Sequence, residues 1–134
     1  MPIIGMTLKK IEANRKKPIT GEVKVNSTPE ITGAKEVDVA TLDKKAVDMS
    51  FDLTTKYEPE IAEIRISGSV LFLTDNTKEI MEQWKDKKRL PEKTSIEVLN
   101  YLFRHCLLKV ANMADELQLP PPLQLPRVKE AKSG

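Results

Sequence analysis

The side chains that could carry out covalent chemistry are few in this chain of 134 residues. A nucleophilic serine or cysteine needs a histidine base within hydrogen-bond reach. The single histidine, His105, is followed at once by the single cysteine, Cys106. Neighbouring residues of a helix point about 100° apart, so these two side chains do not face each other. The sequence has no glycine-rich phosphate loop and no metal-ligand spacing. We therefore expect no enzyme, no cofactor and no metal.

A carboxylate could still act as the base of a lyase or isomerase with an apolar pocket. Asp52 or Glu63 would have to take that role. Both occupy polar positions of an alternating apolar and polar pattern, where the side chain meets water. This makes the enzyme the weakest of three functional hypotheses.

A basic cluster near the start of the chain could grip phosphate groups. It consists of Lys9, Lys10, Arg15, Lys16 and Lys17. Aromatic residues for stacking on bases are not interleaved with it. Lysines also protect the exposed edge of a sheet, which is the simpler explanation. A nucleic-acid-associated scaffold is kept as the alternative function.

Composition limits the class of protein further. Charged residues make up 31% of the chain but nearly cancel, at a net charge of +2, which does not favour nucleic acid as a partner. One cysteine excludes an intramolecular disulfide framework. The N-terminus lacks the order of a signal peptide, and no apolar run approaches the ~18 residues of a membrane span. We expect one cytoplasmic domain without a membrane-inserted segment.

The first part of the chain predicts a strand and a long connection. Met6 and Leu8 share one phase and Ile11 breaks it, which predicts a strand over 6–13 with a bulge. Prolines and glycines interrupt the following residues, 14–35, which we interpret as a surface crossover connection with only short extended pieces.

Two longer strands follow. Apolar and polar residues alternate over 45–57 and again from Ala62 to Phe72, with a short break between them. The pattern predicts an antiparallel hairpin with one buried face. Leu71 and Leu73 break the polar side of the pattern, so the end of the hairpin near Leu73 is apolar on both faces.

Two helices are predicted after the hairpin. Residues 77–89 predict a short, mostly charged helix, with Asn76 and Glu79 as a cap. A long apolar helix is predicted over 93–118. Its buried stripe is expected to consist of Leu99, Phe103, Cys106, Val110, Met113 and Leu117. Other apolar residues lie off that stripe, so the helix needs a second partner, which we expect to be another subunit. The expected interface residues are Leu102, His105, Leu107 and Leu108.

The helix is followed by an apolar strip, ELQLPPPLQLPRV, over 116–128. Three consecutive prolines exclude a helix and favour extended backbone. The strip can cover the exposed end of the sheet or helix, or it can wall a groove that receives extended apolar segments of another chain. The two interpretations are compatible, and we favour the groove wall.

The order of these elements resembles that of the SecB export chaperones. The strongest local match is FRHCLL at 103–108, and PPLQLPRV at 121–128 is similar to the family's proline-leucine segment. MTLKKI at 6–11 fits the family's first strand. The resemblance covers most of the chain as topology, and it is specific as sequence over about 103–128.

The resemblance implies an α+β fold, with an antiparallel four-stranded sheet and one long apolar C-terminal helix packed on it. Residues 1–134 then form a single domain, with 14–35 as its crossover and 119–134 as the proline/leucine strip and frayed tail. Members of the family hold unfolded polypeptides without ATP and assemble as a dimer of dimers. Export, toxin–antitoxin control and general holding are all possible settings. SecB carries a zinc-binding tail for its translocation motor SecA, and no such segment follows the strip here. A motor partner therefore stays open.

Clients of SecB lie in grooves bordered by the crossover and the C-terminal helix. The resemblance and the apolar patterns together predict nine groove residues: Ile19, Val23, Val25, Ile31, Leu71, Leu73, Leu119, Leu123 and Leu125.

Overall fold

Four strands form one antiparallel sheet in the computed structural model, which describes residues 3–120 and 122. They are β1 (Ile3–Arg15), β2 (Lys24–Val39), β3 (Lys44–Glu58) and β4 (Ala62–Leu73), in the spatial order β1-β4-β3-β2. The sheet confirms the predicted α+β class. β1 and β2 are its two edges, and a single turn of 3₁₀ helix (Ala40–Leu42) closes the hairpin between β2 and β3.

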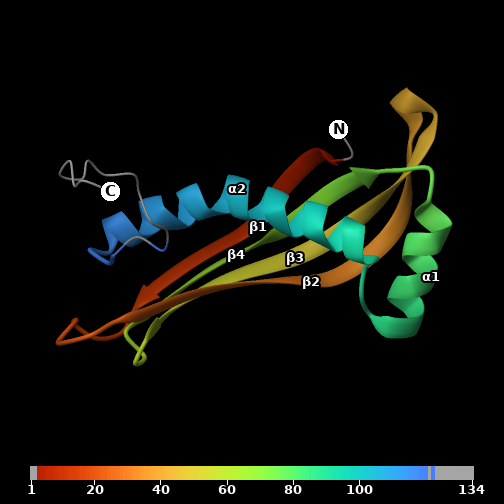
Figure 1. Ribbon diagram of the computed structural model, residues 1–134. Helices are drawn as coiled ribbons and strands as arrows, with labels where there is room; N and C mark the ends of the chain where they lie inside the picture. Colours follow the sequence, from red (N-terminus) through yellow and green to blue (C-terminus); the bar gives the residue numbers. More distant parts are fainter. Residues whose placement is uncertain (1–2, 121, 123–134) are drawn as a thin grey trace, which may run out of the picture.

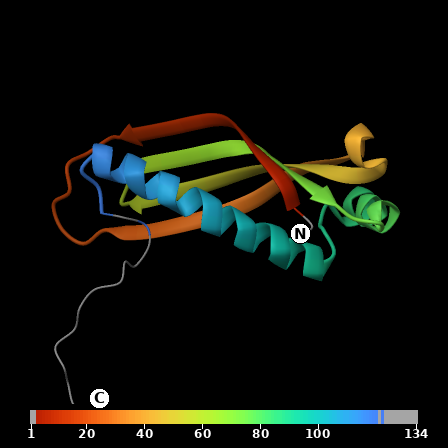
Figure 2. The same ribbon diagram turned by 90° about the horizontal axis from the view of Figure 1, so that it is seen from above.

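Both helices follow the sheet in sequence. α1 (Thr77–Lys87) packs at one end of the sheet, and α2 (Glu92–Glu116) crosses one face diagonally (Figure 1). Seen from above, α2 lies on one side of the sheet while the other side carries no described helix (Figure 2). No helix in the described ranges is long and apolar enough to cross a membrane.

The centre of the sheet follows the predicted hairpin. Phe51 and Leu53 of β3 are buried at 1% and 0% exposure, and their β4 partners are Gly68 and Ile66. The alternate side chains of β3, such as Asp52, point to the open face. Alternation with period two therefore places one apolar row under α2 and one polar row in water.

The predicted bulge in β1 is confirmed. The register between β1 and β4 shifts between Leu8 and Lys10, which brings Ile11 back to the helix-covered face opposite Ile66. β1 also approaches β4 very closely at Gly68, where an added Cβ would lie 2.1 Å from the carbonyl oxygen of Thr7. Only glycine allows this approach, because any side chain would meet backbone.

The prediction of a connection over 14–35 is wrong in its second half. Residues from Lys24 onward belong to β2, which pairs with β3 along its length, and only 16–23 connect the two edges of the sheet. The sequence pattern did not predict β2, because the face of this strand that α2 covers includes Ser27 and Pro29 instead of large apolar residues. The Ser27 hydroxyl is 2.8 Å from that of Thr55, so a polar pair replaces an apolar one inside the fold.

The stripe by which α2 packs on the sheet also differs from the prediction. The buried residues recur every four positions: Val98, Leu102, Cys106, Val110 and Ala114. Steps of four advance about 40° around a helix of 3.6 residues per turn, so the contact line rotates along α2. This rotation suits a helix that crosses a twisted sheet diagonally. The expected members Leu99, Phe103, Met113 and Leu117 flank the stripe and are only partly buried.

α1 is fixed to the sheet through its first turn. Thr77 and Ile80 are buried, and the Thr77 hydroxyl forms a hydrogen bond with Glu36 of β2 that lowers the pKa of this carboxyl. Asn76 is the N-cap residue, as predicted, and Glu79 lies in the first turn, but the Asn76 side chain makes no capping hydrogen bond. Instead the Thr74 hydroxyl accepts the Asn76 backbone N–H at 3.1 Å.

Candidate functional site

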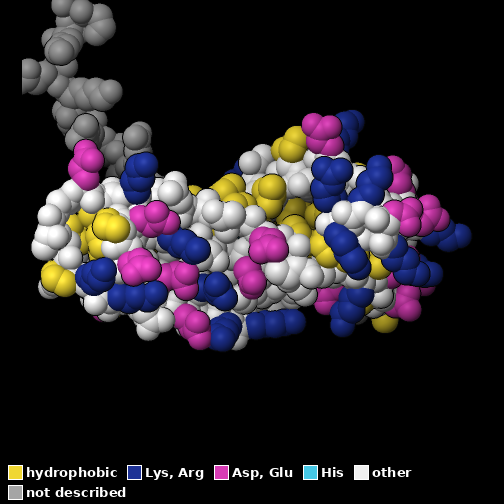
Figure 3. Space-filling model, turned by 90° about the horizontal axis from the view of Figure 1, so that it is seen from below, with side chains coloured by type: hydrophobic (Ala, Val, Ile, Leu, Met, Phe, Trp, Pro, Cys, Tyr) yellow, Lys and Arg dark blue, Asp and Glu magenta, His cyan; other side chains and the backbone are white. Residues whose placement is uncertain are grey.

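A hollow in the described part of the chain lies between α2, β2 and the end of α1. It encloses about 670 Å³. Figure 3 shows hydrophobic side chains gathered on this side of the molecule, toward α1, between basic and acidic ones. The lining residues are Pro29, Glu30, Ile31, Gln83, Trp84, Lys88, Arg89, Leu90, Glu92, Ser95, Ile96 and Leu99. We call this hollow the α2–β2 groove.

β2 supplies one wall of the groove. Val25 and Ile31 pair with the buried residues Tyr57 and Phe51 of β3, so their side chains point to the face that α2 covers. Both are half-buried and pack against the core. Because β2 is an edge strand, no further strand covers this wall among the described residues.

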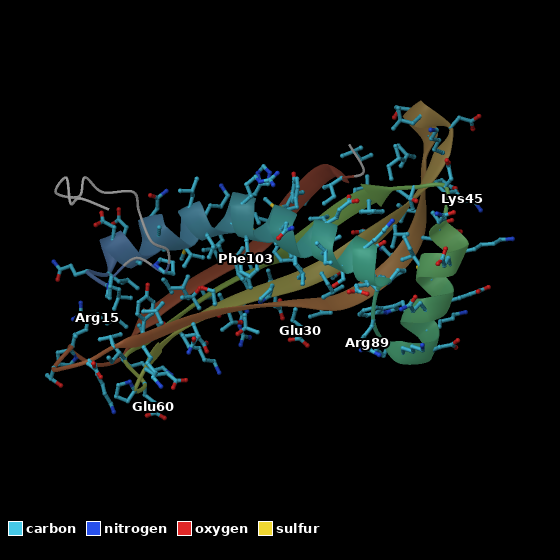
Figure 4. The ribbon with its side chains drawn as sticks, in the orientation of Figure 1. Arg15, Glu30, Lys45, Glu60, Arg89 and Phe103 are labelled. Carbon is cyan, nitrogen blue, oxygen red and sulfur yellow. The ribbon has the colours of Figure 1, made fainter. Side chains whose placement is uncertain are left out.

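The helices supply the other wall. Leu99 and Phe103 are half-buried flanks of α2, and Ile96 is 54% exposed. Figure 4 shows Phe103 beneath α2, on the side toward β2. Trp84 of α1 and Leu90 of the turn before α2 close the groove at its α1 end. The groove therefore has apolar side chains on both sides and is open to solvent.

Charged and polar side chains also line the groove. Lys88 and Arg89 carry positive charge, and Glu92 carries negative charge. Glu30 lines the groove as well, but it pairs with Asp52, so its side chain points to the open face of the sheet. Figure 4 places Glu30 at the sheet edge and Arg89 beside the end of α1.

Two segments lie at the end of the sheet away from α1. They are the connection between β1 and β2 and the residues that follow α2. Ile19 and Val23 are half-buried against the core, and Leu119 is 6% exposed. α2 ends in a reversed turn, in which the Leu119 N–H donates to the Ala114 carbonyl at 2.8 Å and Gln118 has a positive φ of 59°. This ending is a Schellman motif, which directs Leu119 back into the core.

Two further hydrogen bonds fix the chain after α2. The Tyr57 hydroxyl donates to the Pro120 carbonyl, and Arg15 Nη1 donates to the Leu117 carbonyl at 2.7 Å. Tyr57 is fully buried, and this burial raises the pKa of its phenol to about 12. Since Tyr57 pairs with Val25, the proline/leucine strip begins beside the start of β2.

Of the nine predicted groove residues, Ile31 lines the groove. Ile19, Val23 and Val25 pack against the hydrophobic core elsewhere, and Leu119 is part of that core. Leu71 and Leu73 do not line the groove. They alternate with the buried Val70 and Phe72, so they lie on the open face of the sheet, opposite the groove.

The last two predicted groove residues, Leu123 and Leu125, lie outside the described residues. The sequence missed the wall formed by Leu90, Ile96, Leu99 and Phe103. Trp84, a large aromatic residue on an otherwise charged helix, was the signal that could have pointed to this wall.

The expected interface residues of α2 separate into two groups. Leu102 is 0% exposed under α2, so this residue belongs to the core and is not available to a second subunit. Leu108 is 62% exposed, Leu107 is half-buried, and His105 is exposed with its ring 4.0 Å from that of Tyr101. These three residues stay a predicted interface.

The residues considered for acid–base chemistry do not converge on the groove. Asp52 accepts a hydrogen bond from Ser67 at 2.6 Å on the open face, and Glu63 lies on the same face. Cys106 is buried and its Sγ lies 3.9 Å from Met6 Sδ, and burial raises the pKa of its thiol. Within the described ranges, no group of three or more possible ligands could hold a metal ion.

The basic cluster is partly engaged in structural contacts. Arg15 holds the end of α2, Lys10 lies 3.0 Å from Glu12, and Lys17 lies 4.0 Å from Glu60. Pairing with carboxylates reduces the positive potential that a phosphate backbone would meet. The geometry therefore adds no support to the nucleic-acid scaffold.

Known proteins are similar to this chain in structure and not in sequence. No protein-family model and no curated protein sequence matches it. Among solved structures, it is similar to the SecB-like chaperone Rv1957 of Mycobacterium tuberculosis, determined with a ChAD peptide from the Rv1956 HigA1 antitoxin. The TM-score is 0.52 at 18% identity, covering 97% of this chain and 91% of the other. The fold is SecB-like. This fold was expected from the sequence.

Proposed function

We propose that this protein is an ATP-independent chaperone that binds unfolded polypeptides in the α2–β2 groove and keeps them soluble. The observation that supports this most directly is an open groove lined by apolar side chains from β2, α1 and α2, such as Ile31, Trp84 and Ile96. Such a surface matches apolar side chains that a folded client keeps inside, so it selects non-native chains without reading a sequence.

Holding needs no catalytic group. A protein that binds the unfolded state of a client competes with aggregation by mass action. The scattered positions of Asp52, Glu63 and Cys106 agree with a function of this kind. The SecB-like neighbour is a chaperone bound to a peptide, which also supports a polypeptide ligand for this fold.

Assembly as a homo-oligomer, in the form of a dimer of dimers, is part of the proposal. Leu108 supports it, because a leucine that is 62% exposed on an apolar helix gains by burial against a second copy. Light scattering after size exclusion measures the mass directly. A tetramer supports the proposal, and a strict monomer contradicts this part of it.

Aggregation of the insulin B chain after reduction tests the holding function. We expect the protein to delay light scattering without nucleotide when it is present in severalfold molar excess. Ile31→Ser should weaken this protection. Leu71→Ser is the matched control, because Leu71 is an equally half-buried strand residue on the opposite face. A lack of protection by the unsubstituted protein would refute the proposal.

A further inference from the structure

Basic side chains crowd the end of α1, and a function that needs only apolar contacts does not account for them. They are Lys85, Lys87, Lys88 and Arg89, and Asp86 is the one acidic residue among them. Lys85 and Lys87 belong to the last turn of α1, where positive charge is favourable beside the negative end of the helix dipole. Lys88 and Arg89 follow that turn and line the α2–β2 groove. The helix dipole does not explain why these two residues line the groove.

The turn between α1 and α2 fixes where Lys88 and Arg89 lie. The Lys88 N–H donates to the Trp84 carbonyl at 2.9 Å, as the next residue of the helix would, although Lys88 has a positive φ of 54°. Gln83 Nε2 donates to the Leu90 carbonyl at 3.5 Å, and Leu90 is 7% exposed. Figure 4 shows Arg89 at this turn. The two charges are therefore carried by a backbone that hydrogen bonds and a buried leucine hold in place.

The fold does not neutralise the charges of Lys88 and Arg89. Both residues are exposed, and among the residues that the structure describes neither lies within 4.0 Å of a carboxylate oxygen. Glu92 lines the same groove without forming such a pair, and the Glu30 side chain points to the open face of the sheet. A carboxylate that enters the groove with a ligand can therefore pair with both basic residues.

Apolar side chains lie next to this charge at a spacing that an extended chain can match. Trp84 and Lys88 are four residues apart, about one helical turn, and both line the groove, so their side chains leave α1 about 6 Å apart. In an extended polypeptide the side chains of residues i and i+2 share one side and lie about 6.6 Å apart. An apolar client side chain packed against Trp84 thus brings the second residue along the client to Lys88.

We propose that the groove prefers unfolded segments in which an acidic residue lies two positions from a large apolar one. The apolar side chain packs against Trp84, and the carboxylate pairs with Lys88 and Arg89. This inference rests on the proposed function and names the class of client segment that the groove selects. The charge adds specificity, because a basic residue at the same position of the client meets two like charges.

Three labelled peptides test the preference by fluorescence anisotropy. They are repeats of Phe-Ser-Glu-Ser, Phe-Ser-Gln-Ser and Phe-Ser-Lys-Ser, which differ only in the residue two positions after phenylalanine. We expect the glutamate peptide to bind about fivefold tighter than the glutamine peptide, because an exposed ion pair contributes up to about this factor. The lysine peptide should bind most weakly. The advantage of glutamate should shrink at high salt, which screens exposed charges.

The double substitution Lys88→Gln and Arg89→Gln should remove the advantage of the glutamate peptide and leave binding of the glutamine peptide unchanged. Lys85→Gln with Lys87→Gln is the matched control, because it removes the same charge from the neighbouring turn, outside the lining of the groove. This control should keep the advantage. An advantage that survives in the first variant, or that both variants lose equally, would overturn the inference.

A fourth peptide, with repeats of Ser-Ser-Glu-Ser, separates a client site from a plain anion site. We expect it to bind more weakly than the glutamate peptide that contains phenylalanine, and equal binding would overturn the inference. If the protein protects the insulin B chain but does not prefer the glutamate peptide, the inference fails and the proposed function stands. If it gives no protection while the preference and its dependence on Lys88 and Arg89 are seen, only the proposed function fails.

Discussion

The two faces of the sheet differ in what covers them, although the same strands form both. Phe51 and Leu53 on one face are buried beneath α2, while Asp52 and Ser67 on the other are partly exposed and bonded to each other at 2.6 Å. The covered face is too wide for one helix, so its β2 side is left half-buried and forms the groove. A binding surface can therefore arise where the apolar face of a sheet extends beyond the helix that packs on it.

The largest expected effect concerns the fully covered part. Leu102→Ala removes a side chain at 0% exposure between α2 and the sheet, and should lower the free energy of unfolding by about 2–5 kcal/mol. Urea denaturation followed by circular dichroism measures this change. Lys109→Ala, at an exposed position of α2, is the control and should stay within about 0.5 kcal/mol. A similar loss for both variants would contradict the packing described for α2.

The second effect concerns the edge opposite the groove. Gly68→Ala places a methyl group against the Thr7 carbonyl, so β1 must shift, at a cost of about 1–3 kcal/mol. Hydrogen exchange should show faster exchange in β1 than in β3. Gly33→Ala is the comparison, because its new Cβ would lie 3.8 Å from Ser50, at ordinary contact distance. Equal stability of both variants would exclude the close approach.

A smaller effect is expected where the strip is attached. Tyr57→Phe removes the hydrogen bond to the Pro120 carbonyl and should cost about 1 kcal/mol. The phenol has a pKa of about 12 in the fold, above the ordinary value of 10. Its neutral form therefore contributes stability fully below pH 10, and this contribution is lost as the pH rises toward 12. Denaturation between pH 8 and 11 should show a steeper decline for the unsubstituted protein than for Tyr57→Phe. Parallel curves would contradict the role of Tyr57.

The smallest effect on stability and a clear one on binding are expected at the groove. Ile96 is 54% exposed in the free protein, so Ile96→Ser should leave the fold nearly as stable. Partial burial of this side chain by a client is worth about 1 kcal/mol, or about fivefold in affinity. Anisotropy with labelled, unfolded α-lactalbumin measures it. Leu42→Ser, a comparably exposed change in the turn between β2 and β3, should not affect affinity. An equal loss at both positions would contradict a role of the groove in binding.

The sequence carried the signal for β3 and β4 because both faces of these strands follow a strict alternation. It also carried the β1 bulge, visible as the phase change at Ile11. β2 was not predictable in the same way. An edge strand needs only a few apolar contacts, and Pro29, Gly33 and Ser27 conceal the period that remains.

The site shows the same division. Val25 and Ile31 could be proposed from the sequence because apolar residues within a polar segment need a partner. The sequence could not show that Leu71 lies on the opposite face. Alternate residues of a strand face opposite sides, but which side is buried is known only once the register between strands is known. Leu102 was assigned to the wrong side of α2 for a related reason, since the direction in which a helix crosses a sheet selects which row is buried.

The sequence by itself determined β1, the hairpin of β3 and β4, the two helices after it, the apolar character of α2 and the proline stop that follows. These features depend on local periodicity and on backbone chemistry, which neighbouring residues define. The tertiary structure alone decided that α2 crosses the sheet diagonally, that β2 is left as a half-covered edge, and that the strip begins beside it. Those features depend on sheet twist and on contacts such as Tyr57 with Pro120, between residues far apart in the chain.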